Sequence, residues 1–275
     1  MTRYFKSEFY RITRKKATLI TFISAIIFII LCYLMMVGSS SVEVDRKLAS
    51  PLFQFAGGSL ILYTAPFLVI VVTSMVLDSE MKENAYNRAI ESGIRRRDIV
   101  IVKILNSFIA GIILLLTAYL FNLLVSGLIF GFSIYNINML IFFIKSFILL
   151  IIPITAMILL SILIYMTVKN DFLNGILYLI FGVAISKILE YISLLSGKNI
   201  VLTISEYLPA GTFKMIYNNI GIFKIIQYGK LENVINTKIN LSIFTDNIQY
   251  LAVNIGIIVL IVAALFINAN RRDFD

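Results

Sequence analysis

The chain has 275 residues, of which 60% are hydrophobic and 14% charged, and its mean hydropathy is +0.94. Soluble domains carry about 25% charged residues, so this composition excludes an ordinary soluble fold and indicates an integral membrane protein. Histidine is absent and Cys32 is the only cysteine, which excludes a Cys/His metal cluster, a Ser-His-Asp triad and an intramolecular disulfide. We attribute the formal net charge of +9 to membrane orientation and contact with lipid head groups, and expect no nucleic-acid partner.

The first 17 residues form a basic segment with regularly spaced apolar side chains. Phe5, Phe9 and Ile12 fall on one helical face, and basic side chains lie elsewhere around the helix. This pattern predicts an amphipathic helix at the membrane interface. Its candidate residues are Phe5, Glu8, Phe9 and Ile12.

Six apolar stretches have about the 20 residues that a membrane-spanning helix needs. The first is longer than the apolar region of a cleaved signal peptide, so we expect it to be retained as a span. We therefore expect an all-α integral membrane fold in which residues 1–275 form one transmembrane domain. The predicted spans are about 18–37, 59–77, 100–130, 139–168, 172–195 and 248–267.

The basic residues predict the orientation of these spans. With the N-terminus in the cytoplasm, nine of the ten arginines fall in cytoplasmic segments and only Arg46 falls outside. Six spans return the C-terminus to the cytoplasm. Residues 196–247 then form a long extracellular segment, and its apolar runs predict short helices on or within the outer leaflet. The abundance of Ile, Asn and Lys suggests a low-GC bacterium, and we expect the protein in its plasma membrane.

The loop between the second and third spans, residues 78–98, has an amphipathic pattern. Met81, Ala85 and Ala89 recur at a spacing of four and share one helical face. Gly93 sits where a C′ glycine would end that helix. One interpretation is a functional cytoplasmic helix. The alternative is a solvated connector whose arginines at 95–97 only set the topology.

A resemblance favours the functional interpretation. The run from Glu80 to Lys103 resembles the first cytoplasmic loop of permease subunits of type-2 ABC exporters, most closely the bacterial antibiotic- and lantibiotic-immunity permeases. The segment 92–96 (Ser-Gly-Ile-Arg-Arg) and Lys103 fit that loop, whereas Asn84-Ala85 stands where the family has a Gly-Thr-like turn. The N-terminal run 5–16, the basic ending at 271–273 and the order of six spans are also similar to the family.

The resemblance implies a non-catalytic transport subunit. The chain has no G-x-x-x-x-G-K-[ST] motif, so ATP and Mg²⁺ are expected on separate cytoplasmic ABC ATPase subunits, two per transporter. A second permease, identical or different, is also expected. The cargo class implied is an amphipathic peptide antibiotic or lantibiotic, or a similar membrane-embedded compound. The helix of residues 80–92 would couple to the ATPase, with candidate residues Glu80, Met81, Glu83, Ala85, Arg88, Ala89, Glu91, Ser92, Gly93 and Arg95.

Several residues within the predicted spans are unusual for a lipid environment. Pro66 and Pro153 would bend their helices and are candidate gating positions. Lys187 and Glu190 are three residues apart and could pair on one helix face, or extend with Lys145 to the outer interface. The amide side chains that could join helices by hydrogen bonds are Asn106, Asn122 and Asn174.

Three other functions compete with that of an exporter permease. A solitary immunity protein that sequesters a bacteriocin without an ATPase is the main alternative, and a neighbouring gene for a P-loop protein would argue against it. A membrane enzyme is disfavoured because histidine and intramembrane carboxylate pairs are absent. A secondary transporter would show repeat symmetry and a charge relay at the membrane midplane, and the sequence shows neither.

Overall fold

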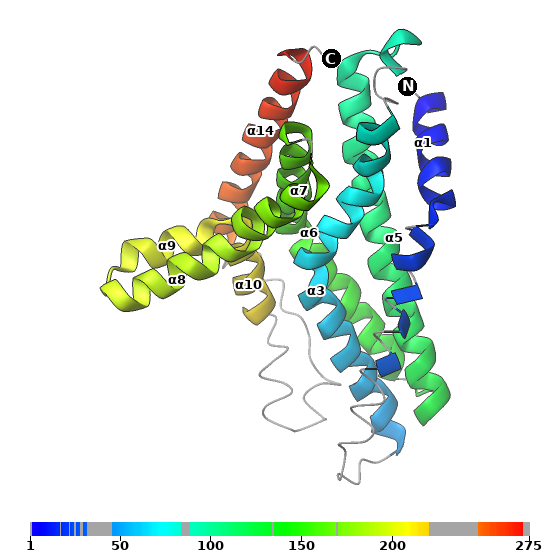
Figure 1. Cartoon of the computed structure of the whole chain (residues 1–275). Helices are drawn as coiled ribbons and strands as arrows, with labels where there is room; N and C mark the ends of the chain where they lie inside the picture. The colour runs from blue at the N-terminus through cyan, green and yellow to red at the C-terminus, as the bar shows by residue number, and fades with distance from the viewer. Residues whose placement is uncertain are drawn as a thin grey trace.

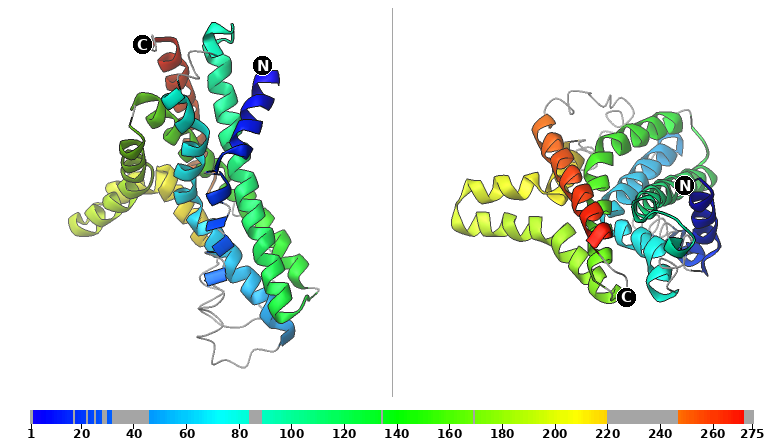
Figure 2. Two further views of the ribbon diagram at one scale, coloured as in Figure 1. Left: turned by 45° about the vertical axis from the view of Figure 1, so that its right-hand side comes forward. Right: turned by 90° about the horizontal axis from the view of Figure 1, so that it is seen from above.

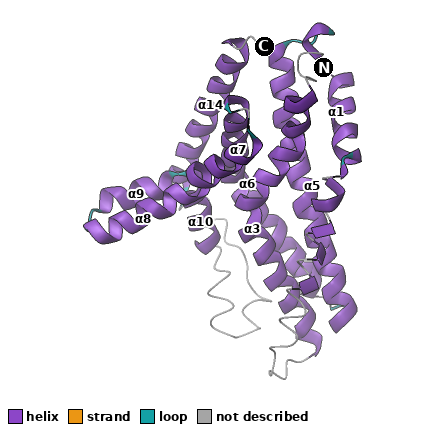
Figure 3. Ribbon diagram, viewed as in Figure 1, coloured by secondary structure: helices purple, strands orange, loops and turns teal. Residues whose placement is uncertain are grey.

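The structure is a computed structural model that describes residues 2–16, 18–21, 23–24, 26–27, 30–31, 46–83, 89–133, 135–168, 170–219 and 247–271. Within these residues every regular element is helical and none is a strand (Figure 3), which confirms the all-α prediction for the described part of the chain. The elements are α1 (Thr2–Arg14), α3 (Arg46–Glu83), α5 (Arg96–Phe130), α6 (Tyr135–Thr167), α7 (Asp171–Tyr178), the π-helix η1 (Leu179–Ala184), α8 (Ile185–Ser196), α9 (Asn199–Tyr207), α10 (Pro209–Asn219) and α14 (Ile248–Arg271).

Five helical stretches in the described residues are long and apolar enough to cross a membrane, so the chain is a multi-pass membrane protein. The expected first span, 18–37, lies only partly within the described residues, and those that are described there are helical. A sixth span therefore stays a prediction. The five stretches are Ser50–Leu77, Arg96–Phe130, Asn136–Thr167, Phe172–Ser196 and Ile248–Ala269.

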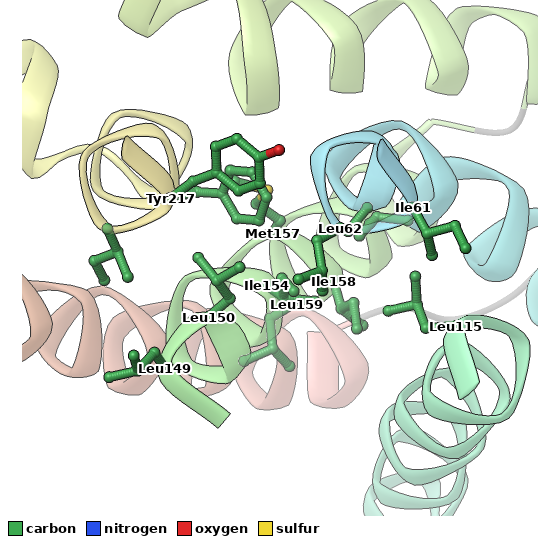
Figure 4. Packing of buried hydrophobic residues seen from close by; sticks show 14 of the residues in the cluster. Ile61, Leu62, Leu115, Leu149, Leu150, Ile154, Met157, Ile158, Leu159 and Tyr217 are labelled. Atoms are coloured by element: carbon green, nitrogen blue, oxygen red, sulfur yellow. The ribbon is translucent and has the colours of Figure 1, made fainter. Parts of the chain in front are cut away.

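The long helices α3, α5 and α6 form the body of the molecule, and α14 packs against α6 (Figures 1 and 2). Apolar side chains from all three fill the space between them. Lipid is as apolar as these side chains, so moving them from lipid into the bundle gains nothing from the hydrophobic effect. Close van der Waals packing holds the helices together instead. Figure 4 shows part of this core, which includes Ile61 and Leu62 of α3, Leu115 of α5, and Leu150, Ile154, Met157 and Ile158 of α6.

A buried polar network joins the same three helices. The Gln54 side chain of α3 donates to Tyr119 Oη at 2.7 Å and accepts from Asn136 Nδ2 at 2.8 Å, while Asn122 Nδ2 donates to the Gln54 carbonyl at 2.9 Å. Asn136 also donates to Ser50 Oγ at 2.9 Å. The prediction that Asn122 joins helices by a hydrogen bond is confirmed. Interhelical bonds of this kind stabilise membrane bundles by about 0.6 kcal/mol each.

Two glycines bring α3 and α5 close enough for this network. A Cβ atom added to Gly57 would overlap the Asn122 side chain, and one added to Gly58 would lie 2.7 Å from the Tyr119 ring. The sequence predicts a second span that begins at residue 59, whereas α3 extends back to Arg46. The glycines and the polar residues before them lower the hydropathy there, but those polar groups are satisfied inside the protein.

The predicted fifth span, 172–195, is not one straight helix. α7 runs along the bundle, η1 interrupts the α-helical hydrogen bonds, and α8 then runs outward and pairs with α9 in a hairpin that projects sideways (Figures 1 and 2). At the bend, a Cβ atom on Gly182 would lie 2.7 Å from the Tyr178 ring. The Tyr178 hydroxyl donates to the Pro66 carbonyl of α3 at 2.8 Å. A π-helical turn held in this way redirects the chain.

The base of the hairpin is fastened to the last span. Asn254 Nδ2 of α14 donates to Thr212 Oγ1 at 2.7 Å and to the Tyr207 carbonyl at 3.3 Å. The Tyr250 hydroxyl donates to Glu206 at 3.2 Å. These contacts fix α9 and α10, which are the described part of the predicted extracellular segment. Residues 220–246 of that segment lie outside the described residues.

Candidate functional site

The N-terminal helix α1 runs alongside α5 rather than across the ends of the long helices (Figures 1 and 2). An interfacial helix would lie roughly at right angles to the spans, so the structure differs from that expectation. Phe5 and Phe9 do share a face, with ring centroids 6.3 Å apart, and Ile12 is buried. Glu8 is also buried on this helix. Its ion pairs give the physical reason for the direction of α1.

Glu8 lies between two cations. Its Oε2 atom is 2.5 Å from Lys103 Nζ of α5 and 2.7 Å from Arg11 Nη2 one turn along α1. Lys103 is 1% exposed and Glu8 is 7% exposed. Burying either charge alone would raise the free energy of the folded state. Each charge compensates the other while α1 stays packed against α5. The cluster of Glu8, Arg11 and Lys103 is called the α1–α5 ion cluster below.

The end of α1 is fastened to α3 as well. Lys15 Nζ donates to the Met75 carbonyl at 2.7 Å, and the buried Thr18 hydroxyl donates back to the Ile12 carbonyl at 2.5 Å. Met75 lies near the end of the span Ser50–Leu77. The N-terminal segment is therefore bonded to both helices that flank the predicted coupling loop.

The predicted coupling loop ends in a defined turn. Gly93 has φ = 87°, its N–H donates to the Ile90 carbonyl at 2.8 Å, and the Ile94 N–H donates to the Ala89 carbonyl at 3.1 Å. This is the pair of bonds of a Schellman motif, so the prediction that Gly93 ends the helix is confirmed. The Ser92 hydroxyl adds a bond to the Ala89 carbonyl at 2.7 Å.

The other predicted coupling residues are only partly described. Ala89 is buried, while Glu91, Ser92 and Arg95 are exposed beside the turn. The backbone of Glu80, Met81 and Glu83 continues α3 without a break, so the predicted helix of residues 80–92 is not separate from the second span at its start. Their side chains lie outside the described part of the structure, as do Ala85 and Arg88 entirely.

Two further polar side chains lie one turn beyond Lys103 on the same face of α5. Asn106 and Ser107 are fully buried, and the Asn106 amide and the Ser107 hydroxyl have no hydrogen-bond partner in the described part of the structure. Asn106 therefore does not join helices by a described hydrogen bond. Among the described residues, the Asn174 side chain bonds locally, to the Val168 carbonyl at 3.2 Å.

A cavity of about 340 Å³ lies between α3, α8 and α10, and is called the lateral cavity below. Its ion pair joins Lys214 Nζ to both carboxylate oxygens of Glu190, at 2.6 and 2.8 Å. Glu190 therefore pairs with α10 and not with Lys187, as the spacing of three had suggested. A second cavity of about 160 Å³ shares this ion pair as part of its wall. The aromatic and charged side chains in the wall of the lateral cavity include Tyr63, Phe67, Lys187, Glu190, Phe213 and Lys214.

The lateral cavity lies beside the middle of a span and not at its end. Tyr63, Pro66 and Phe67 line it and occupy the centre of Ser50–Leu77. The Tyr217 hydroxyl of α10 donates to the Ser59 carbonyl at 3.0 Å, and burial raises the pKa of Tyr217 to about 12, so this hydroxyl keeps its proton at neutral pH. Pro66 thus belongs to the cavity wall, whereas Pro153 lies within α6 away from it.

Neither of these two groupings has a direct signal in the sequence. Glu8 and Lys103 are 95 residues apart, and Glu190 and Lys214 are 24 apart across a hairpin. The available signal was chemical: an acidic residue in a basic helix, and charged residues within apolar spans, each of which requires a partner.

The model of the ABC-2 family transporter proteins matches residues 4–186. The match contains the α1–α5 ion cluster and the Gly93 turn, and it ends before Glu190 and Lys214. No curated protein and no solved structure matches the chain. Members of this family are membrane components of transporters and are generally non-catalytic. Because the match covers well over half of the 275 residues, the chain belongs to the ABC-2 family of transporter proteins.

Proposed function

We propose that the chain is the transmembrane permease subunit of an ATP-driven ABC exporter. Two cytoplasmic ATPase subunits would bind ATP and Mg²⁺, and a second permease, identical or different, would complete the transporter. Family membership supports the transport role. The observation that carries the coupling role is the buried bond between Glu8 and Lys103, because it joins the N-terminal helix to a membrane-spanning helix.

The contacts around this bond suit the transmission of force. α1 is bonded to α5 through the ion cluster and to α3 through Lys15 and Met75, and the Gly93 turn lies between α3 and α5. The helix α1, the C-terminal end of α14 and the start of α5, which follows this turn, lie at the same end of the molecule (Figure 1). An ATPase that closes against that end would move α1, α3 and α5 together. The low dielectric around a buried ion pair strengthens the attraction between its charges. This attraction would hold α1, α3 and α5 in fixed positions relative to one another.

The proposed cargo is an amphipathic peptide antibiotic, a lantibiotic or a similar membrane-embedded compound. The lateral cavity supports this class, because aromatic walls and a few charged groups are typical of sites for amphipathic ligands. The family model does not reach the part of the cavity formed by Glu190 of α8 and Lys214 of α10, so cargo specificity is expected to reside in these two helices.

The test is purification of the tagged chain from its own host in mild detergent, followed by mass spectrometry. We expect a P-loop ATPase at about one copy per permease, since each permease would contact one ATPase. The same sample would show whether the second permease is a different chain. Recovery of this chain alone, under conditions that preserve another ABC complex from the same cells, would overturn the proposal in favour of a solitary immunity protein.

A further inference from the structure

The charges that face the lateral cavity do not balance. Lys187 and Lys214 carry two positive charges there, and Glu190 carries one negative charge. Both Glu190 oxygens are already bonded to Lys214. Lys187 forms no ion pair or hydrogen bond with any described residue. One ammonium group therefore faces the cavity without a counter-charge from the described part of the chain.

The remaining wall is mostly apolar and aromatic, and it lies beside exposed side chains of α8. Phe67 of α3 and Phe213 of α10 line one side, and Leu194 and Tyr191 of α8 line the other while remaining 73% and 67% exposed. In a membrane, side chains exposed in this way contact acyl chains. A molecule from the surrounding bilayer can therefore reach the cavity without crossing a polar barrier.

We infer that the lateral cavity binds an amphiphile with an anionic head group, with the carboxylate or phosphate placed between Lys187 and Lys214 and the apolar chain along Phe67, Phe213 and Leu194. The head group supplies the missing negative charge and takes charge-assisted hydrogen bonds from the ammonium groups. It also competes with Glu190 for Lys214. A cationic amphiphile would meet a net positive charge and a carboxylate that is already paired.

This inference concerns the cavity that the proposed function relates to the cargo, but it can be tested separately, because binding needs neither an ATPase nor ATP. It can therefore be tested on the full-length chain alone, in nanodiscs of phosphatidylcholine. The probe is a long-chain fatty acid with a diazirine on its tail, and the matched control probe is the alkylamine of the same length and diazirine position. After photolysis, mass spectrometry locates the labelled residues.

We expect the fatty acid to label the walls of the lateral cavity about tenfold more than the alkylamine does. The reason is that the one excess positive charge in a partly desolvated site favours an anion over a cation. Lys187→Gln should reduce the labelling about tenfold. Glu190→Gln should increase it, because Lys214 loses its competing partner. Lys145→Gln is the control, since Lys145 is exposed on α6 and does not line the cavity.

The two cavity variants are expected to change the labelling in opposite directions. This difference separates binding from damage to the fold, because misfolding would lower the labelling of both variants. Competition by phosphatidic acid would assign the site to bilayer phospholipids, and its absence would assign it to single-chain acids. Equal labelling by the fatty acid and the alkylamine would overturn the inference. Labelling of Lys187→Gln at the wild-type level would also overturn the inference.

Discussion

Lys103 and Glu8 are 95 residues apart in sequence, yet Nζ of one lies 2.5 Å from Oε2 of the other. Each residue is more than nine-tenths buried. The bond joins an amphipathic N-terminal helix to a membrane-spanning helix, in an environment where neither charge is stable alone. It explains why α1 lies along α5.

The first prediction concerns the order of stability losses in this cluster. Lys103→Met leaves Glu8 with Arg11, whereas Glu8→Gln removes the carboxylate from both cations. Breaking a buried pair costs about 3–5 kcal/mol, and we expect the upper part of that range for Glu8→Gln and a smaller loss for Lys103→Met. Thermal unfolding in detergent measures both. Lys145→Met on exposed α6 surface is the control, and equal melting temperatures for all three variants would contradict this reading of the cluster.

The second prediction concerns the turn that ends the predicted coupling loop. Gly93 has φ = 87° and a Cβ there would meet nothing within 4 Å, so Gly93→Ala acts through backbone strain alone. We expect a loss of about 1 kcal/mol. Gly256→Ala is the matched control, because Gly256 also has open space around it but lies in a regular helix, where alanine is favoured. A melting temperature for Gly93→Ala at or above that of Gly256→Ala would rule out the strained turn.

The third prediction concerns the close contact between α3 and α5. Gly57→Ala would place a methyl group on the Asn122 side chain and displace its bond to the Gln54 carbonyl. We expect a loss of about 1–3 kcal/mol from overpacking. The control is Gly111→Ala, whose new methyl group would make ordinary contacts at 4.0 Å. If Gly57→Ala unfolds at the same temperature as Gly111→Ala, the two helices are not packed at this distance.

The fourth prediction concerns the bend between α7 and α8. Tyr178→Phe removes the hydroxyl that donates to the Pro66 carbonyl. We expect a loss of about 1 kcal/mol, which is typical of one buried hydrogen bond. Tyr191→Phe is the control because Tyr191 is 67% exposed on α8. Hydrogen exchange of α8 should rise only in Tyr178→Phe, and unchanged exchange there would show that the bond does not hold the bend.

Sequence patterns predicted the helical elements well, because a run of about 20 apolar residues has few alternatives to a helix in lipid. They also predicted the Gly93 turn, where a local rule applies. The hairpin was missed because average hydropathy over residues 172–196 does not register a π-helical turn at Gly182. The ion pairs were missed because their partners are distant in sequence, and only folding brings them together.

The most direct test of the account is the rate of ATP hydrolysis by the purified transporter complex in lipid. The complex should carry either the wild-type chain, Lys103→Met, or the charge-swapped pair Glu8→Lys with Lys103→Glu. We predict that Lys103→Met still binds the ATPase but loses most of the stimulation that the permease gives to hydrolysis, and that the swapped pair recovers part of it. Wild-type stimulation in a folded Lys103→Met complex would contradict the claim that this bond couples the ATPase to the membrane helices.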